Sequence, residues 1–401
     1  MFSRHHTGRR AKARMSDCKE GRLIFSPFGI GRRGGFAVVF VSLALLFCAC
    51  RSAPRFTVEP LPGYDAAFER ESGWTGGDGA YTIPLGDGRL LWLFGDSFIG
   101  KVKAGRRVDS RLVNNAAALQ AGRALSRSSL SFFHRSAEDG VPAPLFQPAD
   151  GVGWFWPYHG VRTDRGLYLF LLQVEAAEGP AAFGFRLVAT WLAEVENPDA
   201  SPQNWSLAAR KIPWGDDRRL FGSAVLVREG FVYVYGTVDE AVDGFVRKQV
   251  VLARAPAERL SDFGGWRFYA AGEWVAEAER ASRICEDAAG EFSVSHQAEL
   301  GRYVMVYTEG GLSERIALRT APRPEGPWAE AVSIFNCPEA GWAPEIFCYA
   351  AKGHPGLSAG EDELIVTYVA NATDFSLLEA DARLYRPRFI RISFSAKPPL
   401  D

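Results

Sequence analysis

Short runs of β-branched, aromatic and leucine residues recur along this chain, and few stretches have helical periodicity. Five such runs follow turns that contain Gly or acidic residues: LLWLFGD, LYLFLLQ, FVYVYGT, YVMVYTE and LIVTYVA. Runs of this length between turn residues are typical of buried strands. Five further segments mark where each repeated unit is expected to begin: DGAYTIPL, HGVRTD, GSAVLVRE, FSVSHQAE and CYAAKGHP. The pattern predicts five repeated units of strands.

A tryptophan repeat has the same period. Trp205, Trp266 and Trp328 each follow a strand that enters a small or proline-containing loop, and they lie 61 and 62 residues apart. A regular period of this size indicates repeated structural units. We therefore predict an all-β protein, a five-bladed β-propeller that forms a single domain over residues 65–401 and binds ligands at one mouth of its channel. A pair of β-sandwiches is the alternative, because strand spacing does not separate these architectures.

The N-terminal segment has the features of an export signal. Two arginines precede the apolar run FAVVFVSLALLF, which is too short for a good membrane span and is typical of a signal-peptide core. Cys50 follows an alanine, the small residue that lipoprotein processing favours. We expect residues 1–50 to be a signal peptide with a lipobox, Cys50 to be lipidated, and residues 51–64 to be a tether. The predicted location is extracytoplasmic, anchored to the cell envelope; cleavage followed by release is the alternative.

Composition agrees with a β-rich protein. The chain has 401 residues with 28 Phe and 41 Gly, which favours many short strands and tight turns. The net charge of -1 gives no indication of a nucleic-acid partner. Cys337 and Cys348 either form a disulfide or stay, like Cys285, as buried thiols, and their spacing resembles no zinc site. We expect no metal site and no cofactor, and a structural calcium ion in the channel stays open.

Residues 74–100 contain the most informative pattern. Asp78 lies nine residues before Asp87 and Asp96 lies nine after it, so a hairpin that is symmetric about Asp87 places both carboxylates opposite each other on one face. Like charges in that position repel, a local cost that usually marks a functional site. The segment therefore predicts a paired-carboxylate site.

Two alternatives to this pairing remain open. Gly-Asp-Gly and Gly-Asp-Ser are also common turn sequences, in which the aspartate caps its own backbone. A two-residue loop at Asp87 and Gly88 would shift the register by one. That shift would pair Asp78 with Ser97 and turn the aspartates to opposite faces.

Further polar and aromatic residues near the starts of the units are expected to bind substrate at the same mouth. They are Asn114, Trp156, His159, Ser223, Glu291 and His354. Glu291 is the best candidate for a third carboxylate, and a solvated turn residue is its alternative. His159 is either a ligand of sugar hydroxyls or a structural histidine. Trp156 either stacks on sugar or fills the core.

The chain resembles a bacterial family of secreted five-bladed propellers, a DUF4185-like domain-of-unknown-function family. The motifs that carry the resemblance are GGDGAYTIPLGDGRLLWLFGDSFIG, RTAPRPEGPW, CYAAKGHP and LYRPRFIRI, and the similarity covers most of residues 65–396. One branch of that family is known as endo-D-arabinofuranosidases, which cleave D-arabinan. The resemblance implies a glycoside hydrolase whose two catalytic aspartates match Asp78 and Asp96. Ser97 stands where we expect the family to have threonine.

Glycoside hydrolysis needs one carboxyl group to protonate the leaving oxygen and a second one to attack the sugar or to activate water. Opposed cross-strand residues have Cβ atoms about 4.5–5.5 Å apart, which favours a retaining mechanism. We predict an exported, monomeric hydrolase that cleaves a furanoside polysaccharide or oligosaccharide and contacts the membrane through its lipid anchor. The alternative is a non-catalytic carbohydrate-binding β-propeller lipoprotein.

Overall fold

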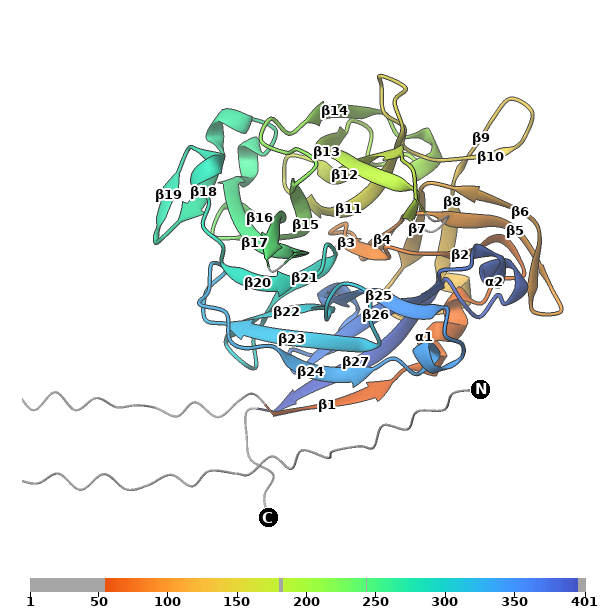
Figure 1. Ribbon diagram of the computed structural model, residues 1–401. Coiled ribbons are helices and arrows are strands. Elements are labelled where there is room, and N and C mark those ends of the chain that lie inside the picture. The colour runs from red at the N-terminus through yellow and green to blue at the C-terminus, as the bar shows by residue number, and fades with distance from the viewer. Residues whose placement is uncertain (1–54, 180–182, 243, 396–401) are drawn as a thin grey trace, which may run out of the picture. The chain divides into compact units, whose positions relative to one another are not determined.

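Five antiparallel sheets account for most of the computed structural model, which describes residues 55–179, 183–242 and 244–395 (Figure 1). The first sheet contains β3 (Tyr81–Pro84), β4 (Arg89–Phe94), β7 (Ala116–Ala121) and β8 (Leu130–Phe133). The second contains β11 (Trp154–Arg162), β12 (Leu167–Ala176), β13 (Phe185–Val195) and β14 (Leu207–Lys211). The third contains β15 (Arg219–Arg228), β16 (Phe231–Val242), β17 (Phe245–Pro256), β18 (Arg267–Ala270), β19 (Glu273–Val275) and β20 (Cys285–Ala288). The fourth contains β21 (Phe292–Gln297), β22 (Arg302–Thr308), β23 (Arg315–Ala321) and β24 (Val332–Asn336). The fifth contains β25 (Ile346–His354), β26 (Glu363–Ala372), β27 (Pro387–Ser395) and β1 (Arg55–Pro60).

Two smaller sheets and a few short helices decorate these five sheets. The three-stranded sheet contains β2 (Ser72–Gly77), β5 (Ser97–Lys103) and β6 (Arg106–Val113), and the two-stranded sheet contains β9 (Arg135–Ser136) and β10 (Pro142–Ala143). The α-helices are α1 (Pro62–Asp65) and α2 (Phe375–Ala380). The 3₁₀ turns are η1 (Ala66–Phe68), η2 (Arg127–Ser129), η4 (Pro202–Asn204), η5 (Ala257–Arg259), η6 (Phe263–Gly265), η7 (Ala278–Arg280), η8 (Pro338–Gly341) and η9 (Pro355–Leu357).

The first strands of the five sheets are neighbours in a cyclic order. β3 contacts β11, which contacts β15; β15 contacts β21, β21 contacts β25, and β25 contacts β3. Each sheet keeps its own hydrogen-bonded ladder, so the sheets meet through side chains and not through shared strands. The starts of chain segments far apart in sequence therefore come together around one centre.

The predicted strand pattern is confirmed. The five apolar runs form β4, β12, β16, β22 and β26, the second strand of each sheet, and the five unit starts overlap the first strands, although HGVRTD reaches only the end of β11. These second strands read as continuous apolar runs because sheets cover them on both faces: eight successive residues of β12 are buried. Trp205 and Trp266 lie between the third and fourth strands of their sheets, where their indole N–H groups donate to Ala200 O and Leu260 O at 2.9 Å. The tryptophan repeat therefore reflects a structural connection, not a ligand site.

The N-terminal strand completes the fifth sheet. Residues 55–60 form β1, which pairs with β27 in antiparallel register from Arg55 opposite Ser395 to Pro60 opposite Ile390. The prediction of a tether over residues 51–64 is wrong for this part, because the backbone of residues 55–60 is paired with β27 along its whole length. Hydrogen bonding between the two ends of the described chain ties them into one sheet.

The predicted signal peptide and the lipidation site at Cys50 lie outside the described residues. Within the described ranges no helix is long and apolar enough to cross a membrane. Cys285, Cys337 and Cys348 are buried free thiols. Contact with Cys348, together with burial, raises the pKa of the Cys337 thiol.

Candidate active site

The hairpin adopts the register that is symmetric about Asp87. Tyr81 pairs with Leu93 in the first sheet, and Gly77 pairs with Ser97 in the three-stranded sheet, so Asp78 and Asp96 lie opposite each other between the two ladders. The Asp78 N–H donates to Asp96 O at 3.3 Å. The predicted opposition is confirmed, and the one-residue slip that would pair Asp78 with Ser97 does not occur.

The two aspartates occupy a break in the strands. The ladder stops between β2 and β3, where Gly79 and Ala80 adopt positive φ values of 73° and 56°. Such left-handed residues turn the chain sharply and release the neighbouring side chains from the regular alternation of a strand. On the partner segment, a Cβ on Gly95 would collide with Asp78 Oδ1. The carboxyl group of Asp78 therefore lies directly over the backbone of Gly95, and glycine is needed there.

Two tyrosines hold Asp78: Tyr349 lies in β25 of the fifth sheet, and Tyr385 lies just before β27 of the same sheet. Oδ2 of Asp78 accepts hydrogen bonds from the Tyr349 hydroxyl and, at 3.0 Å, from the Tyr385 hydroxyl. Asn371 in turn donates to the Tyr349 hydroxyl at 3.2 Å. Burial raises the pKa of Asp78 to about 8, the charges of Asp96 and Glu291 add to the rise, and the two hydroxyls oppose it. Burial therefore favours the protonated form of Asp78.

Asp96 has a different set of partners. Its Oδ1 accepts hydrogen bonds from the Trp156 indole N–H at 2.7 Å and from the Asn114 amide at 3.3 Å. Burial raises the pKa of Asp96 to about 6, and the two donors oppose the rise. Between about pH 6 and pH 8 the pair therefore holds one protonated and one ionised carboxyl group, the division of roles that acid–base catalysis uses.

A third carboxylate is joined to the pair through a buried lysine. Lys352 is 1% exposed, and its ammonium group donates to Glu291 Oε2 at 2.8 Å, to Ala350 O at 2.8 Å and to Gly79 O. The ammonium group also lies 4.4 Å from the centre of the Tyr81 ring. Burial lowers the pKa of Lys352, and Glu291 opposes that effect. The prediction of Glu291 as the third carboxylate gains support, because Lys352 connects it to the turn that carries Asp78.

The two histidines predicted to bind substrate hold strands together. The Nε2 atom of His159 lies 3.1 Å from Thr82 O, and its Nδ1 atom accepts the Val225 N–H at 3.0 Å, so this ring bridges β3, β11 and β15. Burial lowers the pKa of His159 to about 4, so the ring is neutral. His354 is 1% exposed, with its ring nitrogens 2.8 Å and 2.7 Å from the hydroxyls of Thr82 and Thr367. The expectation that His354 lines the cleft is wrong, because its ring is enclosed between strands.

Ser223 is also fully buried, so it does not line the cleft as expected. It lies in a β-bulge of β15 between Phe221 and Ala224, and matching bulges interrupt β11 and β25. Bulges re-aim side chains and are frequent beside functional sites, so the position of a residue in the repeat does not reveal which way its side chain turns. The repeat alignment found the right region of each first strand without resolving the direction of its side chains.

The structure adds residues that the sequence analysis missed. Tyr349 and Tyr385 contact Asp78 although they lie 271 and 307 residues away from it. Their only sequence signal is membership of the segments CYAAKGHP and LYRPRFIRI, because nothing local distinguishes these tyrosines from core aromatics. Within the described residues no cluster of His, Cys, Asp and Glu has the arrangement of a metal site.

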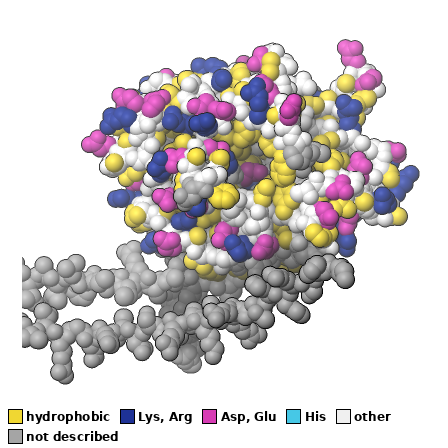
Figure 2. Space-filling model, in the orientation of Figure 1, with side chains coloured by type: hydrophobic (Ala, Val, Ile, Leu, Met, Phe, Trp, Pro, Cys, Tyr) yellow, Lys and Arg dark blue, Asp and Glu magenta, His cyan; other side chains and the backbone are white. Residues whose placement is uncertain are grey.

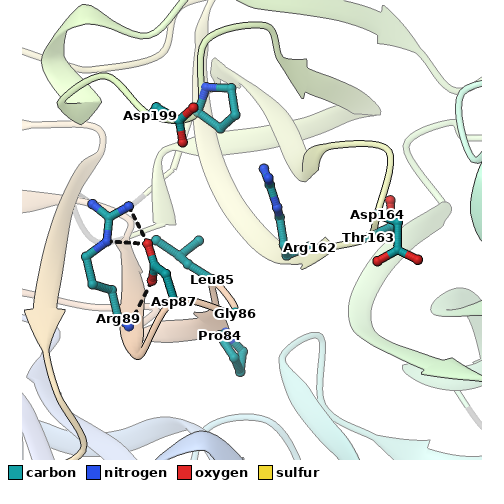
Figure 3. Close-up of a pocket in the computed structure, with 10 residues that line it drawn as sticks. Pro84, Leu85, Gly86, Asp87, Arg89, Arg162, Thr163, Asp164 and Asp199 are labelled. Carbon is teal, nitrogen blue, oxygen red and sulfur yellow. Dashed lines mark hydrogen bonds and ion pairs between the residues drawn. The ribbon is translucent and has the colours of Figure 1, made fainter.

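A separate pocket of about 490 Å³ lies at the turn end of the same hairpin (Figure 3). Its lining includes Asp87 and Arg89 from the first sheet and Arg162, Asp164 and Asp199 from the second. Asp87 and Arg89 form an ion pair of 2.6 Å within it. Neither Asp78 nor Asp96 lines this pocket, since both lie at the opposite end of β3 and β4. In the space-filling view, one face of the molecule is hollowed near its centre, with hydrophobic side chains around the hollow (Figure 2).

Of the solved structures that are similar to this chain, a protein from Bacteroides ovatus shows a shared fold. A "putative hydrolase" from Bacteroides ovatus is 20% identical with a TM-score of 0.69, and the match covers 86% of this chain and 92% of that one. An endo-arabinase from Bacteroides thetaiotaomicron is 10% identical with a TM-score of 0.46, covering 82% and 99%. The GH43_1 enzyme from Xanthomonas citri, complexed with xylotriose, is 15% identical with a TM-score of 0.44, covering 84% and 94%. The class that these findings establish is a mostly β protein with the fold of the Bacteroides ovatus protein.

The family follows from a match over most of the chain. Residues 62–394 match the model of DUF5005, a domain of unknown function, and the chain belongs to this family. The DUF4185-like family that the motifs resemble is not the one that this match shows. No curated protein sequence matches the chain.

Proposed function

We propose that this chain is a five-bladed β-propeller glycoside hydrolase whose reaction takes place at Asp78 and Asp96. The observation that supports it is the pair of opposed carboxyl groups with unequal pKa values, raised to about 8 and about 6. Such a pair supplies a proton donor and an ionised partner at neutral pH, which is what cleavage of a glycosidic bond requires.

In this proposal Asp78 is the acid and Asp96 the ionised partner. Asp78 Oδ2 is occupied by Tyr349 and Tyr385, which leaves Oδ1 to carry the proton toward the glycosidic oxygen. The indole of Trp156 and the amide of Asn114 both donate to Asp96, which stabilises its charge. The opposed backbone positions of Asp78 and Asp96 favour the short separation of a retaining enzyme, about 5–5.5 Å between carboxyl groups.

The stereochemical course tests this assignment. Early products are analysed for anomeric configuration by proton NMR, and retention supports the pairing of Asp78 with Asp96. Inversion would contradict this pairing. The carboxylate that activates water would then be Glu291, the other carboxylate that raises the pKa of Asp78.

The substrate proposed is a furanoside polysaccharide of the D-arabinan type, on the strength of the motif resemblance in residues 74–100. The described domain is incubated with D-arabinan, L-arabinan and fructan, and products are followed by mass spectrometry. Release of oligosaccharides from D-arabinan supports the proposal. Binding of D-arabinan without any product, by the native chain and by Asp78→Asn alike, would instead identify a carbohydrate-binding protein.

We also propose that the protein is exported and anchored to the envelope through a lipid on Cys50. Cells that produce the native chain or a Cys50→Ala variant are labelled with radioactive palmitate and fractionated. Label and membrane association in the native chain alone support the anchor, and equal release of both forms would contradict it.

A further inference from the structure

Two chains of aromatic residues lead away from the proposed catalytic carboxyl groups. From Asp96, the Trp156 indole that donates to the carboxylate packs edge-on against Phe185, with ring centres 4.7 Å apart. From Asp78, the ring of Tyr349, whose hydroxyl donates to the carboxyl group, lies 5.7 Å from the ring of Phe347. Each carboxyl group is thus the end of an aromatic path.

A further ring contact joins the two paths. Phe183, two residues before Phe185, lies 6.2 Å from Phe347 with the ring planes 30° apart. Phe185 opens β13 of the second sheet, whereas Phe347 belongs to β25 of the fifth. The contact therefore closes an arc of rings that starts at Asp96 and ends at Asp78.

The aromatic arc, defined as Trp156, Phe185, Phe183, Phe347 and Tyr349, lies where the core meets solvent, because three of its members pack against core residues and none of the five is fully buried. All five rings keep access to solvent, and Phe183 is 38% exposed. A partly exposed aromatic surface that continues into a pair of carboxyl groups matches the composition of a ligand site, which combines apolar walls with a few oriented polar groups. The C–H faces of a sugar ring pack on aromatic faces, while its hydroxyl groups reach the polar ones.

We propose that Phe183 and Phe347 form the wall of a sugar-binding subsite that bounds the cleft on one side of the carboxyl pair. The occupant is one sugar residue of the saccharide whose bond is cleaved, so this inference rests on the proposed function and deepens it. Trp156 and Tyr349 touch the carboxyl groups and position the reacting groups, whereas Phe183 and Phe347 contact the sugar without touching either carboxyl group. The two kinds of residue should therefore affect different kinetic constants.

The test compares Phe183→Ala and Phe347→Ala with Phe231→Ala, a control at a half-buried phenylalanine at the start of β16, which lies at the opposite end of its sheet. Initial rates on D-arabinan are measured, and binding of D-arabinan by Asp78→Asn chains with and without each change is followed by affinity gel electrophoresis. Loss of an aromatic contact should raise KM and weaken binding about threefold to tenfold and leave kcat within about twofold, with no effect in the control. Phe183→Leu and Phe347→Leu keep most of the side-chain volume but remove the ring. They measure the contribution of the ring to KM and to binding if an alanine variant does not fold.

The possible outcomes separate the two proposals. If the native chain cleaves D-arabinan and all phenylalanine variants match the control, the subsite is wrong and the glycosidase stands. If the native chain binds but does not cleave, and the two variants lose binding, the subsite stands and the catalytic proposal is wrong. Absence of both cleavage and binding overturns both.

Discussion

The two ends of one hairpin carry the same residue type in opposite electrostatic states. At the turn end, Asp87 is exposed and pairs with Arg89, whose hydrogen bonds lower the pKa of Asp87. At the other end, Asp78 and Asp96 accept hydrogen bonds from hydroxyl, indole and amide groups, all of them uncharged, and burial raises both pKa values. The sequence context of all three is a Gly-Asp step, so the difference comes from what the fold places around each carboxyl group.

This contrast teaches how an unremarkable turn sequence becomes a candidate site. A solvated carboxylate beside an arginine stays ionised and contributes little to stability or to catalysis. A carboxyl group enclosed by aromatic rings and faced by other carboxylates holds its proton near neutral pH. Changing the two ends in parallel therefore separates local turn chemistry from active-site chemistry.

The largest expected effect is on turnover. Asp78→Asn and Asp96→Asn should each lower kcat on D-arabinan by about 10²–10⁴-fold, because each removes a group needed for proton transfer or attack. Asp87→Asn, at the turn end, should leave kcat within about twofold. Reducing-sugar release over time gives the rates, and an equal loss in the Asp87 variant would remove the distinction between the two ends.

The next largest effect concerns the free energy of unfolding. Lys352→Met should lower it by about 3 kcal/mol, because it leaves Glu291 and the carbonyl groups of Gly79 and Ala350 without their buried partner. Arg89→Met breaks the exposed pair at the turn end and should cost about 0–1 kcal/mol. Urea unfolding measures both values. Equal costs would show that the lysine contributes no more than a surface charge.

A smaller effect is expected on the pH profile. The Tyr349 and Tyr385 hydroxyls favour the ionised form of Asp78, so Tyr349→Phe and Tyr385→Phe should raise its pKa further. Because Asp78 acts in its protonated form, the alkaline limb of kcat should move to higher pH in both variants. Rates measured from pH 5 to pH 10 test this, and a shift toward lower pH would contradict the proposed role of Asp78.

A further contrast between the two ends is a pair of opposite trends of stability with pH. The pKa of Asp78 is raised from 3.8 to about 8, so its contribution to folding is fully present below pH 3.8 and is lost as the pH rises through 8. Asp78→Asn should therefore unfold at a higher temperature than the native chain at pH 8 or above. The pKa of Asp87 is lowered, so its contribution is present above pH 3.8 and is lost as the pH falls.

Thermal unfolding of both variants between pH 3 and pH 9 measures these trends. Asp87→Asn should lower the unfolding temperature slightly at neutral pH, with the difference disappearing in acid. Parallel curves for the two variants would mean that the ends of the hairpin do not differ as proposed.

Much of the architecture could be predicted from local pattern. The runs that became β4, β12, β16, β22 and β26 are apolar throughout because each lies between two sheets, and that environment is visible in composition alone. The closing strand β1 was missed, since RFTVEP is short and its pairing partner lies at the other end of the chain. Strand pairing over such a distance leaves no local signal.

The candidate site shows the same division. The spacing of Asp78 and Asp96 about Asp87 was enough to place them opposite each other, because a hairpin register depends on the turn and on the residues within a few positions of it. The alignment of unit starts also selected Glu291. The same alignment selected His354 and Ser223, which are buried, because bulges and packing decide which way a first-strand side chain turns.

The sequence by itself therefore determined the strands, their grouping into five units and the opposition of two aspartates, all of which depend on short-range periodicity and turn chemistry. Only the tertiary structure decided the surroundings of those aspartates: the tyrosines on Asp78, the lysine between Glu291 and Gly79, and the aromatic arc from Phe185 to Phe347. These contacts join residues that are far apart in the chain. They exist because the cyclic order of the sheets brings the first, second and fifth together, and the resulting burial is what raises the pKa of both carboxyl groups.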